Sequence, residues 1–191
     1  FLSENCDFAQ SVIDTGAIWI GPSTEAITTM GDKMAARKLA IHADATVVPG
    51  TTEPLLNIKD AKKTANKIGY PLLIKAAGGG GGKGIRIIQS GKDLEDAMIR
   101  AKSEAKKAFS DNRIYMEKYL EQPHHIEIQV FADNYGNTVS LGERECSIQR
   151  RYQKIIEETP SPFIDDNLRQ KLSNTALNIT KSCNYTGAGT V

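Results

Sequence analysis

The chain has 191 residues, of which 40% are hydrophobic and 25% charged, with a formal net charge of +1 at pH 7. These values predict a soluble globular protein with one large domain or two small ones. No apolar run is long enough to span a bilayer, and the charge gives no general affinity for nucleic acid or anionic membranes, so we expect neither as a partner.

The chain ends and the cysteines indicate a fragment from a reducing compartment. Cys6, Cys146 and Cys183 are odd in number and lack C-x-x-C spacing, which favours neither a disulfide framework nor a zinc cluster. The chain begins at Phe1 without a signal-peptide pattern and stops where a strand is predicted to begin. We interpret it as an internal piece of a longer protein.

The first part of the chain combines helices with a short extended segment. A helix over 7–15 and a strand over 17–20 have the pattern that ends an α/β unit. Ser23 or Thr24 can begin the next helix, and a run of Ala, Lys, Met and Leu predicts a helix over 32–43.

The middle of the chain has the pattern of a small α+β unit. Asn57 is a good helix N-cap and Gly69 a good helix stop, while apolar residues from Leu94 to Phe109 form a stripe at helical spacing. We expect helices to cover one face of a sheet. The predicted order is an extended segment at 47–50, helix 57–68, strand 70–76, a glycine loop, strand 84–89, helix 93–109 and strand 113–120.

The last part predicts a second, antiparallel sheet with a helix packed on it. Its predicted strands are 124–133, 138–145 and 154–159, and its predicted helix is 166–183. We therefore divide the chain into four parts: the tail of an N-terminal α/β domain (1–22), a connecting helical segment (23–46), a lid subdomain with the glycine loop (47–119) and the first part of a central domain (120–191).

A glycine run between two lysines is the most distinctive motif. Gly78 to Gly82 follow Lys75 and precede Lys83. Because glycine loses more entropy on ordering than any other residue, a run inside a folded segment indicates close backbone approach or positive φ. Bare N–H groups and two ammonium groups favour an anion, and we predict a nucleotide phosphate.

Three alternatives fit the glycine run less well. A flexible linker is disfavoured because both flanks are predicted strands, which makes the run a hairpin tip. The P-loop pattern fails because Ala77 replaces its first glycine and Gly84 its hydroxyl residue. The fingerprint G-x-G-x-x-G fits Gly79, Gly81 and Gly84, but it requires a helix where a strand is predicted.

Strict alternation in 124–130 places His125, Glu127 and Gln129 on one face of a strand. The polar face fits a ligand site, and a solvated face explains it equally well. A His-x-Glu zinc deaminase site is disfavoured because its Pro-Cys-x-x-Cys partner is absent.

Two other segments have the composition of binding sites. The segment 143–154 holds four basic groups at a strand end, which fits an anion site; a solvated charge run is the alternative. In 115–120, Glu117 can accept from an exocyclic amino group and the following backbone can pair with a purine edge. An exposed Glu–Lys pair on an edge strand is the alternative here.

Together these residues resemble the ATP-grasp fold, and within it the biotin carboxylase family of acetyl-CoA, propionyl-CoA and pyruvate carboxylases. The resemblance implies an α+β ATP-grasp fold. The blocks that carry it stand in family order along nearly the whole chain: Phe1–Asn5, Gly21–Pro22, Met30–Lys33, Ile74–Ala77 with the glycine run, Tyr115–Leu120, Glu143–Arg151 and Gly187–Thr190.

The resemblance also implies roles for single residues. It gives Lys33 and Lys75 to the ATP phosphates, with Lys75 also near the purine. It gives Gly81 and Gly82 to the loop that closes over ATP, Glu117, Lys118 and Leu120 to adenine, His125, Gln149 and Tyr152 to the nucleotide pocket, and Lys154 to bicarbonate as a catalytic residue.

Tyr152 departs from the family pattern, which usually has a histidine there. A tyrosine hydroxyl can hydrogen-bond and its ring can stack, but it does not become cationic near neutral pH. We predict that Tyr152 keeps ATP binding.

The implied reaction is ATP- and bicarbonate-dependent carboxylation of biotin on a carrier protein through carboxyphosphate. Mg²⁺ is implied too, but the family's magnesium-binding glutamates and biotin arginines follow the Gly-Ala-Gly-Thr block and are outside this chain. We therefore expect the fragment alone to be inactive. The implied partners are biotin carboxyl carrier and carboxyltransferase parts and further copies in a homo-oligomer, in the cytoplasm or the mitochondrial matrix.

Two alternative functions remain. Another ATP-grasp ligase, such as a carbamoyl-phosphate synthetase, is disfavoured by the block 143–151. A noncatalytic nucleotide-binding module would gain support if the residues after Val191 lack paired glutamates followed by Asn and Arg. The acyl acceptor is chosen by a separate carboxyltransferase part, so this sequence does not name it.

Overall fold

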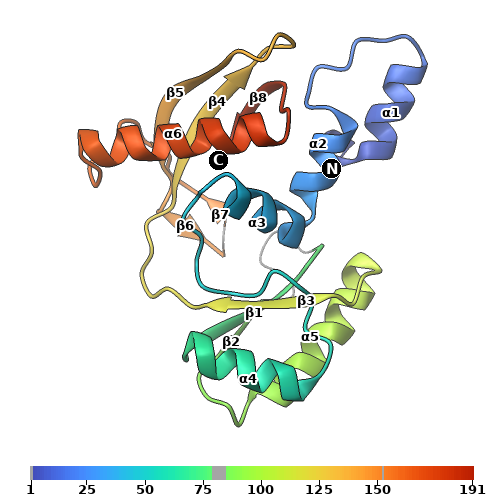
Figure 1. The fold of residues 1–191 in the computed structure, drawn as a ribbon, viewed down its shortest axis with the longest axis vertical. Helices are drawn as coiled ribbons and strands as arrows, with labels where there is room; N and C mark the ends of the chain where they lie inside the picture. Colours follow the sequence, from blue (N-terminus) through green and yellow to red (C-terminus); the bar gives the residue numbers. More distant parts are fainter. Residues whose placement is uncertain (1, 79–84, 152) are drawn as a thin grey trace. The chain divides into compact units, whose positions relative to one another are not determined.

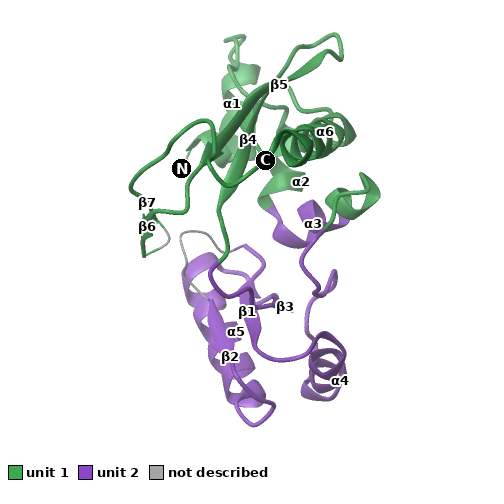
Figure 2. Cartoon of the chain, turned by 90° about the vertical axis from the view of Figure 1, so that its left-hand side faces the viewer, with its two compact units in different colours: residues 1–31, 39–46, 123–191 green, residues 32–38, 47–122 purple. Residues whose placement is uncertain are grey.

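The computed structural model describes residues 2–78, 85–151 and 153–191 (Figure 1). The chain divides into two compact units (Figure 2). Unit 1 consists of Phe1–Gly31, Leu39–Thr46 and Pro123–Val191, and unit 2 of Asp32–Lys38 and Val47–Gln122. The four-part division at residues 22, 46 and 119 stays a prediction.

Unit 2 is built on an antiparallel sheet with the strand order β2–β1–β3. Helices α4 and α5 share one hydrophobic core with this sheet. The predicted helices and strands from 57 to 118 are confirmed. Their bounds are α4 Ile58–Ile68, β1 Leu72–Ala76, β2 Arg86–Ile88, α5 Leu94–Phe109 and β3 Ile114–Lys118.

The extended segment predicted at 47–50 does not form a strand of the sheet, and a single bridge joins Gly50 to Glu117 there. The chain passes β3 at close range, with the N–H of Thr51 donating to the carbonyl of Met116 at 2.8 Å. This spacing needs a glycine, since a Cβ at position 50 would lie 2.6 Å from the same carbonyl oxygen.

Local sequence sets the ends of α4 and the two faces of β1. The Asn57 side chain accepts from the N–H of Asp60 at 2.9 Å, and Gly69 ends the helix with a φ of 82°. Strand β1 alternates buried and half-buried residues, so Leu72 and Ile74 enter the core. Lys75 consequently lies on the opposite face.

Unit 1 contains a second antiparallel sheet, with the order β5–β4–β8. Helix α6 packs on one face, where Leu172 and Ala176 contact Ile128 and Val130. The bounds are β4 Ile126–Ala132, β5 Thr138–Glu145, α6 Asp166–Ser182 and β8 Gly187–Thr190, with a separate pair of short strands, β6 Gln149–Arg150 and β7 Gln153–Lys154. Before them lie the short 3-10 helix η1 Leu2–Glu4 and the helices α1 Cys6–Asp14 and α2 Thr24–Gly31; α3 Lys33–His42 contains the boundary between the units.

Two predicted strands of unit 1 are wrong. Residues 17–20 form no strand, and Ile18 and Ile20 are 89% and 94% exposed. Apolar and β-branched residues favour a strand only where a partner strand is available. Within 154–159 only Lys154 lies in a strand, and a single bridge pairs Glu158 with Glu145. Between them, the N–H groups of Ile155 and Ile156 both donate to the carbonyl of Ile148 and interrupt the ladder.

None of the helices in the described ranges combines the length and the apolar composition that crossing a bilayer requires.

Candidate functional site

Lys75 and Glu117 form an ion pair across two neighbouring strands of unit 2. Lys75 pairs in register with Tyr115, and Leu73 with Glu117, so Lys75 and Glu117 are diagonal neighbours on the face opposite the helices. The Lys75 ammonium donates to the Glu117 carboxylate, and the two side chains are only 22% and 14% exposed. Glu117 therefore fixes the direction of a predicted phosphate-binding lysine.

Lys33 is the first residue of α3 and is held through its neighbours. The Asp32 carboxylate accepts from the N–H groups of Met34 at 2.9 Å and Ala35 at 3.0 Å, which caps the helix. The N–H of Lys33 donates to the carbonyl of Ala77 at 3.4 Å. Because Ala77 directly follows β1, the main chain of Lys33 lies next to the strand that carries Lys75.

The ammonium of Lys118 is directed to the main chain. It donates to the carbonyls of Gly69 at 3.0 Å and Tyr70 at 2.7 Å. The main-chain N–H of Lys118 donates to the carbonyl of Pro49 at 2.7 Å. Leu120 follows the end of β3 and is 48% exposed. An adenine contact by Lys118 would use its main-chain carbonyl or require the ammonium to leave its two acceptors.

In unit 1, four charged side chains form what we call the Glu127 cluster: Glu127, Arg144, Lys154 and Glu157. Arg144 donates to Oε1 of Glu127 from Nε at 2.8 Å and Nη2 at 2.6 Å, and Lys154 donates to Oε2. Glu157 forms ion pairs with both cations: its carboxylate oxygens lie 3.4 Å from Nζ of Lys154 and 3.3 Å from Nε of Arg144. The Glu127 side chain is only 8% exposed, so this carboxylate is the buried centre of the cluster.

Pairing sets the protonation of the Glu127 cluster. Burial by itself disfavours the charged carboxylate, but hydrogen bonds from Lys154 and Arg144 outweigh it and hold the pKa of Glu127 below its ordinary value. The hydrogen bond to Glu127 in turn raises the pKa of Lys154. Lys154 is therefore a charged ammonium at neutral pH, held in place by a buried carboxylate.

Of the two interpretations left open for the polar face of β4, the solvated one does not hold at Glu127, whose side chain is only 8% exposed. The sequence placed Glu127 on the polar face but gave it no role, and it counted Arg144 among the four basic groups of 143–154 without a role of its own. Alternation with period two cannot distinguish a solvated carboxylate from one covered by cations that come 17 and 27 residues later. The available signal was the basic segment 143–154, which supplies both cations.

His125 and Gln149 lie together, as the predicted pocket requires. Nε2 of Gln149 is 2.6 Å from Nδ1 of His125 and donates to the carbonyl of Cys146 at 2.8 Å. Since the amide nitrogen carries two protons, the second is available to Nδ1, which places the imidazole proton on Nε2. That Nε2 lies 3.7 Å from Oε2 of Glu127, so the pair borders the Glu127 cluster.

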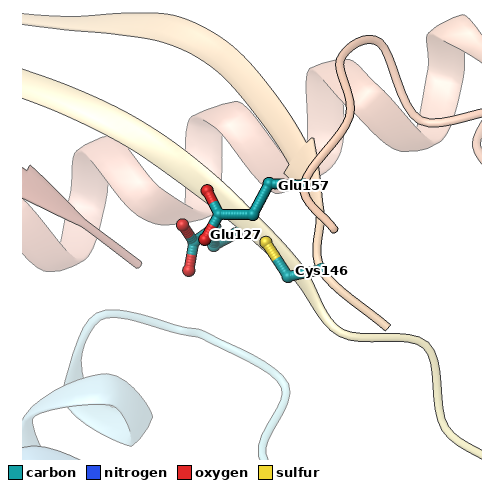
Figure 3. A group of neighbouring side chains, drawn as sticks. All are labelled: Glu127, Cys146 and Glu157. Atoms are coloured by element: carbon teal, nitrogen blue, oxygen red, sulfur yellow. The ribbon is translucent and has the colours of Figure 1, made fainter. Parts of the chain in front are cut away.

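Glu127, Cys146 and Glu157 offer three ligand atoms within 4.8 Å of one another (Figure 3). The group does not fit Mg²⁺, which prefers oxygen ligands in octahedral geometry. Both carboxylates already accept from cations. Burial also raises the pKa of the Cys146 thiol, which stays protonated and a poor ligand. We therefore describe this group as part of an ion-pair network.

Three predicted site residues, Gly81, Gly82 and Tyr152, lie outside the described residues. The described ones fall into two sets. Unit 2 pairs Lys75 with Glu117 across its sheet, places the main chain of Lys33 next to Ala77 and has Lys118 and Leu120 at the end of β3; unit 1 brings His125, Gln149 and Lys154 around Glu127.

Residues 32–191 match the family described as the ATP-binding domain of the carbamoyl-phosphate synthase L chain. The chain belongs to this family. Over its full length it is 47% identical to biotin carboxylase 1 of Bacillus subtilis and covers 42% of that protein.

Solved structures show the same relationship. A biotin carboxylase–β,γ-ATP complex from Campylobacter jejuni is 47% identical, with a TM-score of 0.96 over 100% of this chain and 43% of that one. The biotin carboxylase domain of 2-oxoglutarate carboxylase from Hydrogenobacter thermophilus, solved with MgADP, ADP and bicarbonate, is 42% identical, with a TM-score of 0.94 over 100% and 42% of the two chains.

The predicted ATP-grasp fold and the resemblance to biotin carboxylases are thereby confirmed. The chain spans less than half the length of each of these three proteins. The fold thus belongs to this chain, while the activity of a whole biotin carboxylase comes to it as a proposal.

Proposed function

We propose that the chain is the nucleotide- and bicarbonate-binding part of a biotin carboxylase, an ATP-dependent ligase that carboxylates biotin on a carrier protein. The observation that carries the proposal is the match of the entire chain, at a TM-score of 0.96, to a biotin carboxylase solved as a β,γ-ATP complex. A second neighbour of the whole chain was solved with MgADP and bicarbonate.

In the proposed enzyme, unit 2 binds ATP. Lys33 and Lys75 bind the phosphates, Gly81 and Gly82 close over them, and Glu117 orients Lys75 until the phosphates replace it as the acceptor. This exchange suits an ammonium, which presents three donors from a flexible stem. Glu117, Lys118 and Leu120 form the adenine slot, the last two through their main chain.

Unit 1 binds bicarbonate in the proposed enzyme. Lys154 attracts the anion, and His125, Gln149 and Tyr152 contact the nucleotide. An oxygen of bicarbonate attacks the γ-phosphorus of ATP, which breaks the bond to the β-phosphate oxygen and gives ADP and carboxyphosphate. Biotin then takes the carboxyl group and inorganic phosphate leaves. The lysines neutralise charge on the transferring phosphoryl group.

Mg²⁺, when bound, supplies further charge neutralisation at the phosphates. We propose that its carboxylate ligands come from a part of the enzyme outside these 191 residues. For the same reason we expect the isolated chain to be inactive.

We propose biotin carboxyl carrier and carboxyltransferase parts as the partners, in a homo-oligomeric enzyme of the cytoplasm or the mitochondrial matrix. The acyl acceptor is set by the carboxyltransferase part.

One observation favours a second candidate function, since the matching family is named for a carbamoyl-phosphate synthase. That enzyme would not respond to biotin.

The test is ATP hydrolysis by the full-length protein, measured with and without bicarbonate and with free biotin. We expect hydrolysis to require bicarbonate and to rise with biotin, and Lys75→Ala to lower kcat/KM for ATP about 100-fold, because it removes a charged phosphate contact (~2.7 kcal/mol). Lys62→Ala, on the exposed face of α4, is the matched control and should match the wild type. Hydrolysis that ignores bicarbonate, or unchanged kinetics in Lys75→Ala, would refute the proposal.

A further inference from the structure

Arg113 connects three elements of unit 2. It directly precedes β3, and its Nη1 lies 2.9 Å from Oδ2 of Asp32, the residue that caps α3. The Asp32 carboxylate thus has three partners: Oδ1 accepts from the helix N–H groups of Met34 and Ala35, and Oδ2 pairs with Arg113.

A second carboxylate fixes the orientation of the Arg113 side chain. Nε of Arg113 donates to both oxygens of Asp111, at 3.1 and 2.9 Å, and Nη2 donates to Oδ2 at 2.7 Å. The N–H of Arg113 also donates to Oδ1 at 2.9 Å. Such a fork restricts the guanidinium much more than a single ion pair would.

Main-chain hydrogen bonds connect Arg113 to Lys33 through Ala77, which directly follows the strand that carries Lys75. The carbonyl of Arg113 accepts from the N–H of Ala77 at 2.9 Å, and the carbonyl of Ala77 accepts from the N–H of Lys33 at 3.4 Å. Ala77 is fully buried against Met34 and Tyr115. The end of β1, the start of β3 and the first turn of α3 therefore meet here.

The electrostatics agree with this geometry. Burial opposes ionisation of Asp32, but the N–H groups of Ala35 and Met34 and the Arg113 guanidinium outweigh it, so the pKa of Asp32 lies below its ordinary value. The hydrogen bond from Arg113 likewise lowers the pKa of Asp111. Both carboxylates are charged at neutral pH, and both hold the same guanidinium.

We propose that Arg113 is a positioning residue that fixes Lys33 relative to Lys75 for binding ATP phosphates. The inference rests on the proposed function of these lysines. Arg113 acts through Asp32 and the Ala77 main chain and does not touch the nucleotide. We expect unit 2 to keep its fold without Arg113, because the core lies among α4, α5 and the sheet.

The test compares variants of the full-length protein in bicarbonate-dependent ATP hydrolysis. We expect Arg113→Met to raise KM for ATP about 5- to 10-fold while kcat changes less than 2-fold. Arg113→Lys, which keeps the charge but loses the fork, should have an intermediate KM. Lys62→Met removes another surface ion pair of the same unit, between α4 and α5, and should keep the wild-type KM.

A double-mutant cycle separates positioning from direct contact. Asp32→Asn keeps the helix cap, because asparagine caps as well as aspartate, but removes the ion pair with Arg113. Positioning predicts that Asp32→Asn raises KM and that the double variant Asp32→Asn/Arg113→Met is no worse than Arg113→Met alone. Additive effects would show that Arg113 does not act through Asp32 and would overturn the inference.

Other outcomes distinguish the inference from its premise. An unchanged KM in Arg113→Met overturns the inference while the proposed function stands. A wild-type protein without ATP hydrolysis refutes the proposed function instead. A lower melting temperature with an unchanged KM in the remaining folded protein would show a purely structural role and would also overturn the inference.

Discussion

Glu127→Gln is the most informative single change, because it removes the charge at the centre of the Glu127 cluster and keeps the shape. The glutamine oxygen can still accept from Arg144. Its amide nitrogen, however, takes the place of the oxygen that accepts from Lys154. Two donors then face each other in a site where the residue at 127 is nearly inaccessible to water.

The magnitude follows from these contacts. A hydrogen bond to a charged group contributes about 1.5–3 kcal/mol, and a buried unsatisfied donor adds to the loss. The Arg144 and Lys154 side chains are 30% and 33% exposed, so hydrogen bonds to water compensate part of this loss of free energy. We expect a net destabilisation of about 2 kcal/mol, which corresponds to a melting temperature lower by about 4–8 °C for a unit of 150–250 residues and by less in a longer protein.

Function should change as well, since Lys154 loses the acceptor that fixes it. We expect KM for bicarbonate to rise about 10-fold, which equals ~1.4 kcal/mol. The assays are thermal unfolding and bicarbonate-dependent ATP hydrolysis of the full-length protein.

Glu157→Gln is the matched control for Glu127→Gln. It removes a carboxylate that pairs with the same two cations, but this carboxylate is 40% exposed and farther from them. We expect a cost of about 0.2–1 kcal/mol, as for other exposed pairs. If the two variants behave alike, burial of Glu127 does not determine the strength of the cluster and the reasoning is refuted.

Two further predictions concern packing and pH. Gly50→Ala should destabilise unit 2 by about 1–3 kcal/mol, because the new Cβ would lie 2.6 Å from the Met116 carbonyl oxygen; Gly31→Ala, with nothing within 4 Å, should show no such loss in thermal unfolding. Burial would raise the pKa of Glu143, but the hydrogen bonds it accepts from Arg169 and from the Ser161 N–H lower it below the ordinary 4.5. At this position the unfolded state therefore binds a proton more readily than the folded state. The contribution of ionised Glu143 to the free energy of unfolding is complete above pH 4.5 and is lost as the pH falls. As the pH falls from 7 to 3, the melting temperature should fall less steeply in Glu143→Gln than in the wild type. An equally steep fall in both would contradict the lowered pKa of Glu143.

The elements predicted best are those with strong local signals. Asn57 and Gly69 define α4 by capping, and the apolar stripe from Leu94 to Phe109 defines α5. These signals act within a few residues, so they are visible in the sequence. The failures at 17–20 and 154–159 have the opposite cause, because a strand exists only where a partner completes its hydrogen bonds.

The sequence by itself determined the ATP-grasp fold and family, through blocks of residues whose order along the chain is their evidence. It also named Lys75, Glu117, His125, Gln149 and Lys154 as candidates. Only the tertiary structure decided what each of them contacts.

The physical reason is the distance along the chain between interacting groups. Arg144 and Lys154 fold back onto Glu127 and cover it, and β3 brings Glu117 next to β1, where it orients Lys75. The desolvation of a charge depends on everything packed around it, so a sequence can nominate a charged residue, but the fold decides whether water or another side chain is its partner.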